Sequence, residues 1–157
     1  MAAYYALACA GNWGAVVYCA RRRAFFWAVV WLGVAIAFGA MAASSLAGRP
    51  PALAESVKRT IDGLMTPASV TVGFFALLVV VYLGRAIFVK RAVAWAGLCA
   101  AAAFFGASLA DEHFARVVAE PDHVPIVAMV LLLGFFTWLG MAQAVENDRR
   151  LAKGLPP

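Results

Sequence analysis

Two histidines and four carboxylates form the densest group of chemically capable side chains in the sequence. They lie within residues 111–123 and are Asp111, Glu112, His113, Glu120, Asp122 and His123. Imidazoles and carboxylates are ligands of divalent metal ions, and two imidazoles can ligate a haem iron. The group is compatible with three alternatives: a metal site, a haem held by His113 and His123, or a polar connector that caps the flanking helices.

The other reactive side chains form no recognisable motif. Cys9, Cys19 and Cys99 lie in apolar segments without CxxC or CxxCH spacing, which favours packing roles for all three. We find no phosphate-binding glycine loop and no nucleophile elbow, and no nucleophile, base and electrophile can be assembled from neighbouring positions. The sequence therefore predicts that the chain is not an enzyme.

Five apolar stretches, uncharged apart from Arg85 near the end of the third, must position these side chains. The composition is 65% hydrophobic and 13% charged, and the mean hydropathy is +0.86, which leaves too little polar surface for a soluble globule. Each stretch approaches the length that a helix needs to cross the roughly 30 Å hydrocarbon core. We expect an all-α, polytopic integral membrane protein with spans at about 2–20, 24–48, 69–89, 92–110 and 125–144.

The basic residues between the stretches predict an orientation. Nine lie on one side of the membrane: Arg21, Arg22, Arg23, Arg85, Lys90, Arg91, Arg149, Arg150 and Lys153. Four lie on the other side: Arg49, Lys58, Arg59 and Arg116. Because the side richer in basic residues stays in the cytoplasm, the N-terminus is expected outside and the C-terminus inside.

The stretch 2–20 is the most polar of the five, since it contains Gly11, Asn12 and Gly14. Its positive charge follows the apolar run, whereas a signal peptide carries that charge first. We expect a retained span. The alternative is a helix on the cytoplasmic surface, with four true spans in unchanged orientation.

The lengths of the connections predict how the spans pair. Tight turns near 21–23 and 90–91 predict two antiparallel hairpins packed side by side, followed by a C-terminal helix, in one bundle covering 1–157. The one substantial outer loop, 49–68, has apolar residues at helical spacing and predicts an amphipathic helix at about 52–65. Small residues spaced four apart, such as Ala35 and Gly39, predict close helix packing.

The membrane core lacks ionisable side chains. No Asp, Glu, Lys or His lies at the middle of a predicted span, so no proton relay or charged-substrate site is expected, and active transport is disfavoured. His113 and His123 both lie near the outer surface. They leave no axial ligands for a haem held in mid-membrane.

The C-terminal quarter of the chain resembles a known kind of membrane segment. The residues concerned are 120–127, the aromatic group Phe135-Phe136-Thr137-Trp138, the charged run 146–150 and the final residues 154–157. This segment is similar to the membrane anchors of bacterial quinol:cytochrome c oxidoreductases and related cytochrome complexes. The resemblance implies an association with an electron-transfer complex in the bacterial inner (cytoplasmic) membrane, although the redox motifs of such subunits are missing.

We therefore expect a non-catalytic, multi-pass subunit that scaffolds a cytochrome-bearing partner and borders a quinone site. Phe135, Phe136, Thr137 and Trp138 would face the partner or the quinone. Asp111, Glu112, Glu120 and Asp122 would receive a basic periplasmic cytochrome. No cofactor is expected in this chain alone; haem or quinone would lie in a partner. Lipid and integral membrane subunits are the expected partners, and nucleic acid is not.

Two alternatives from other classes remain open. In the first, a small membrane protein binds a metal or haem at the outer face through His113 and His123. In the second, the chain is a carrier or channel for a neutral solute, which needs no intramembrane charge.

Overall fold

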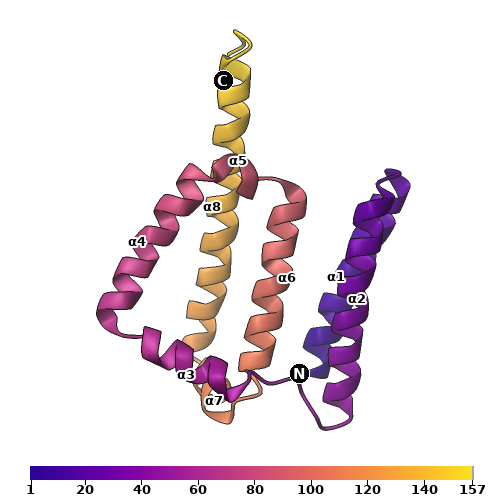
Figure 1. Ribbon diagram of the computed structural model, residues 1–157, viewed down its shortest axis with the longest axis vertical. Coiled ribbons are helices and arrows are strands. Elements are labelled where there is room, and N and C mark those ends of the chain that lie inside the picture. The colour runs from indigo at the N-terminus through magenta and orange to yellow at the C-terminus, as the bar shows by residue number, and fades with distance from the viewer. Residues whose placement is uncertain (157) are drawn as a thin grey trace. The chain divides into compact units, whose positions relative to one another are not determined.

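The computed structural model describes residues 1–156 and is 82% helical, with no strand in that range (Figure 1). Its helices are α1 (Ala2–Arg21), α2 (Phe25–Leu46), α3 (Glu55–Leu64), α4 (Pro67–Leu83), α5 (Arg85–Phe88), α6 (Arg91–Ser108), α7 (Glu112–Ala119) and α8 (His123–Leu151). The chain forms two compact units. The first contains 1–53 and 98–116, and the second contains 54–97 and the chain from Val117 onward.

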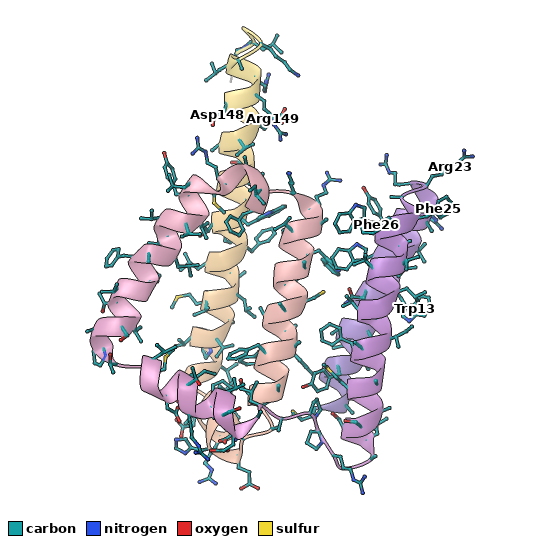
Figure 2. All side chains as sticks on the ribbon, in the orientation of Figure 1. Trp13, Arg23, Phe25, Phe26, Asp148 and Arg149 are labelled. Carbon is teal, nitrogen blue, oxygen red and sulfur yellow. The ribbon has the colours of Figure 1, made fainter. Side chains whose placement is uncertain are left out.

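An antiparallel hairpin of α1 and α2 forms most of the first unit, as predicted (Figure 1). The tight turn between them is closed by Arg23, whose φ of 57° is left-handed and whose N–H donates to Ala20 O. Figure 2 shows Arg23 at the tip of this hairpin, with Phe25 and Phe26 beside it. The hairpin core is one face of α2 together with a buried tyrosine of α1, and consists of Tyr5, Ala28, Trp31, Ala35 and Phe38.

The second half of α6 packs against α1 within the same unit. Tyr4 Oη donates a hydrogen bond to Ala102 O at 2.8 Å. The buried Gly106 lies under the rings of Tyr4 and Tyr5, so the two helix backbones approach closely. Contacts between residues far apart in sequence therefore hold α1, the most polar of the predicted spans, against α6.

Asn12 contributes to the polarity of the predicted span 2–20, and the structure buries it almost completely, at 1% exposure. Its side-chain amide donates to Ala8 O at 2.9 Å, and its Oδ1 accepts from Cys99 Sγ at 3.4 Å. Satisfied polar groups cost little to bury. Cys99 thus adds a weak hydrogen bond to the packing role predicted for it.

The second unit begins with α3, which lies within the predicted amphipathic range of 52–65 and confirms that prediction. A bend of 91° separates α3 from α4. Thr66 caps α4 by accepting from Ser69 N–H at 3.2 Å, and Pro67 occupies the first helical turn, where its missing N–H costs nothing.

The predicted span at 69–89 is not one continuous helix, because the helix breaks at Gly84 between α4 and α5. The ring of Phe88 folds back over this glycine, and a Cβ added there would lie 2.7 Å from the ring and 3.0 Å from Val80 O. Only glycine permits so close an approach.

The second predicted hairpin is not confirmed and stays a prediction. Within the second unit α4 contacts α5, and α5 contacts α8. The break at Gly84 turns the chain early, so the short α5 takes the place of the tight turn expected near residues 90–91.

Three helices within residues 1–156 are long and apolar enough to cross a membrane: α2, α6 and α8. A fourth candidate arises if the bent pair of α3 and α4 is counted as one broken span. These helices are compatible with a multi-pass membrane protein. Five spans are not confirmed, since α1 is absent from the set and α4 has only 17 residues.

Candidate functional site

A helix that the sequence analysis missed, α7, lies inside the histidine-containing loop. It is capped by Asp111, whose Oδ1 accepts from the backbone N–H groups of His113 at 3.0 Å and Phe114 at 3.2 Å. The signal was present in the sequence as a capping aspartate followed by Phe114, Val117 and Val118 at helical spacing. The Asp111 carboxylate therefore has a structural use.

The six predicted residues of this loop are divided between the two units. Asp111, Glu112 and His113 belong to the first unit, and Glu120, Asp122 and His123 belong to the second. Within the second unit the ligand atoms of Glu120, Asp122 and His123 all lie within 4.8 Å of one another. The structure thus brings together half of the predicted constellation, with a single imidazole in it.

His123 is the centre of this group and the first residue of α8. Its Nδ1 lies 3.0 Å from Glu120 Oε2 and 3.8 Å from Asp122 Oδ1. This nitrogen is shielded from solvent, yet within the described residues no neighbour meets hydrogen-bond geometry with it, including the nearby Glu120 oxygen. A cation between the imidazole and the two carboxylates would satisfy all three groups.

The exposure of these side chains limits the coordination they can offer. The side chains of His123, Glu120 and Asp122 are 38%, 51% and 82% exposed. One imidazole and two carboxylates suit a divalent transition metal, with water completing the shell. The second axial imidazole that a bis-histidine haem requires is not part of this group.

The aromatic group predicted on the last span forms a contiguous patch on α8. The rings of Phe135 and Phe136 lie 5.4 Å apart, edge to face, and those of Phe135 and Trp138 lie 6.2 Å apart. Phe135, Phe136 and Thr137 are exposed, whereas Trp138 is half-buried. The exposed part of the patch is open to lipid or to another chain.

A second polar site, where α5 meets α8, was not predicted. Arg85 Nη2 lies 3.3 Å from Asp148 Oδ2, and its guanidinium lies over the Tyr82 ring at 5.0 Å from the centroid. In the sequence, Arg85 indicates only the orientation of the chain in the membrane. The break at Gly84, which creates α5, carries Arg85 to α8, and the spacing of charges gave no signal of it.

No family model, curated protein or solved structure matches this chain. The similarity of residues 120–157 to cytochrome-complex anchors consequently stays a prediction.

Proposed function

We propose that this chain is a non-catalytic, multi-pass subunit of a bacterial inner-membrane electron-transfer complex that scaffolds a cytochrome-bearing partner. The observation that supports this most is that the rest of the chain leaves the apolar part of α8 uncovered. Its most apolar 18-residue window has 0% of its residues buried within the chain. Since such a helix is stable only when lipid or other helices cover it, its surface is available for packing between subunits.

Trp138 supports a protein or quinone partner for this surface rather than lipid alone. Its Nε1 is hidden from solvent, and the described residues provide it with no acceptor. An N–H group in hydrocarbon is stabilised by an acceptor such as a partner carbonyl or a quinone oxygen. The exposed rings of Phe135 and Phe136 would flank that contact.

The proposed topology keeps five spans, with the N-terminus outside and the C-terminus inside. Because α1 packs along α2 and its Asn12 is hydrogen-bonded, the two helices can enter the membrane as one hairpin. The 17 residues of α4 reach about 25 Å, close to the hydrocarbon thickness, while the amphipathic α3 lies on the outer surface.

The same topology places an acidic surface on the periplasmic side. Glu112, Glu120 and Asp122 are exposed, and complementary charge would steer a basic cytochrome toward them. Asp111 contributes less to this surface than the sequence suggested, since it caps α7.

The test is to purify the tagged chain from its native membrane in a mild detergent and then measure cytochrome association by stopped flow. We expect haem-bearing subunits in fixed stoichiometry. In the combined variant Glu112→Lys, Glu120→Lys, Asp122→Lys, the association rate at low salt should fall about tenfold or more.

The matched control is Glu146→Lys, an exposed charge on the opposite side in the proposed topology. It should leave the rate unchanged. A chain that purifies without haem-bearing subunits would contradict the scaffolding role. An unchanged rate in the triple variant would remove the docking role alone.

A second candidate function is metal binding at Glu120, Asp122 and His123, favoured by the convergence of their ligand atoms. We expect Zn²⁺ binding, measured by calorimetry on the purified protein, to weaken about tenfold or more in His123→Ala. His113→Ala is the matched control and should bind normally. Equal losses in both variants, or no zinc binding by the unaltered protein, would refute this site.

A further inference from the structure

A hollow of about 430 Å³ lies in the second unit where α5 packs against α8. Its lining residues are Leu83, Arg85, Ala86, Val145, Asp148, Arg149 and Ala152. Figure 2 shows Asp148 and Arg149 on α8 beyond its crossing with α5. The lining combines an apolar wall with two guanidinium groups, and neither the docking surface nor the metal group uses it.

The guanidinium groups of this hollow are only partly engaged. Arg85 contacts Asp148 at 3.3 Å and Tyr82 O at 3.5 Å, both long for charge-assisted hydrogen bonds. Arg149 Nη1 lies 3.7 Å from Glu146 Oε2, and both side chains are 62% exposed. Because a guanidinium offers five N–H donors, each arginine retains capacity for a phosphate.

The sequence segments that contain the lining residues are rich in basic residues. Six basic residues of this unit either line the hollow or lie close in sequence to a lining residue, namely Arg85, Lys90, Arg91, Arg149, Arg150 and Lys153. Two acidic residues, Glu146 and Asp148, accompany them, so six minus two leaves a net charge of +4. Such an excess attracts an anion and disfavours a zwitterion.

The apolar wall determines what kind of anion fits. Leu83 is 73% exposed, and its neighbours Tyr82 and Ile87 are 64% and 56% exposed. This surface continues from the hollow along the apolar α4. A ligand with a phosphate group and long hydrocarbon chains would cover the wall and meet the arginines together.

We propose that the hollow between α5 and α8 binds the headgroup of an anionic phospholipid, with Arg85 and Arg149 on the phosphate and an acyl chain along Leu83. The proposal rests on the membrane insertion and inward-facing C-terminus of the proposed function. Asp148 holds Arg85 in place in the free protein and competes with the phosphate for it.

The experiment is native mass spectrometry of the full chain in detergent, titrated with phosphatidylglycerol or phosphatidylcholine. We expect phosphatidylglycerol to be retained in preference. The double variant Arg85→Gln, Arg149→Gln should bind it about tenfold more weakly, and Asp148→Asn should bind it several-fold more tightly. Circular dichroism checks that each variant is folded.

Arg150→Gln, Lys153→Gln is the matched control, since it removes the same charge from residues outside the lining. Equal losses in the two double variants would overturn the site, as would equal retention of the two lipids. Displacement of the lipid by millimolar inorganic phosphate would identify a free-phosphate site instead. Alkaline carbonate extraction of membranes tests the proposed function separately. A chain that this treatment releases is not an integral membrane subunit, whereas a retained chain that fails to bind the lipid contradicts the lipid site alone.

Discussion

Gly106→Ala is expected to destabilise the first unit by about 2–3 kcal/mol, a large effect for one methyl group. The added Cβ would lie 2.7 Å from Tyr5 Oη and 2.8 Å from ring carbons of both Tyr4 and Tyr5. Neither ring can give way easily. Tyr5 is fully buried, and Tyr4 is held by its hydrogen bond to Ala102 O. The second half of α6 should therefore separate from α1.

The matched control lies on the same helix. Gly97 has no atom within 4 Å of a Cβ built on it, so Gly97→Ala should be neutral or slightly stabilising through better helix propensity. Unfolding of both variants in mixed micelles by SDS titration gives the comparison. Equal stability of the two variants would show that α6 does not pack on α1 in this way.

Ala35→Leu is the second change with a large expected effect, about 2–4 kcal/mol of destabilisation. Ala35 is 0% exposed in the hairpin core, between the buried side chains of Trp31 and Phe38 on the same face of α2. One turn away, a Cβ on Gly39 would lie in van der Waals contact with Cys9 Sγ at 3.6 Å, so α1 lies close to α2 at this level. A leucine side chain at this position would push α1 and α2 apart.

Ala37→Leu controls for the change in hydrophobicity, since Ala37 is exposed on the same helix. The melting temperature in detergent, followed by circular dichroism, should fall by several degrees or more for Ala35→Leu and stay constant for Ala37→Leu. A similar fall in both would indicate that α2 does not use this face against α1.

The sequence was sufficient where hydropathy or amphipathic spacing repeats over many residues. It predicted α2, α6 and α8 from apolar length and α3 from the spacing of its apolar residues. The pair Ala35 and Gly39 also lies at a close helix contact, as small-residue spacing suggested. These are local signals, carried by the segment itself.

Features that depend on distant or very short contacts were not predictable in the same way. At the break the Phe88 ring is folded over Gly84, a contact that the hydropathy pattern does not indicate. The hydrogen bond between Asn12 and Cys99 joins residues 87 positions apart. The residues of the histidine-containing loop are adjacent in sequence, and nothing in that sequence indicates that they belong to two units.

The length of α8 has a mechanical consequence. Its 29 residues extend about 43 Å, so in the proposed topology roughly 13 Å of helix would extend beyond a 30 Å hydrocarbon layer. Val145 is buried in the second unit, where α5 packs on α8. This contact lies one turn before Arg149 and Arg150. The packing of α5 on α8 would therefore fix the distance of these charges from the bilayer. A partner protein could recognise them at that distance.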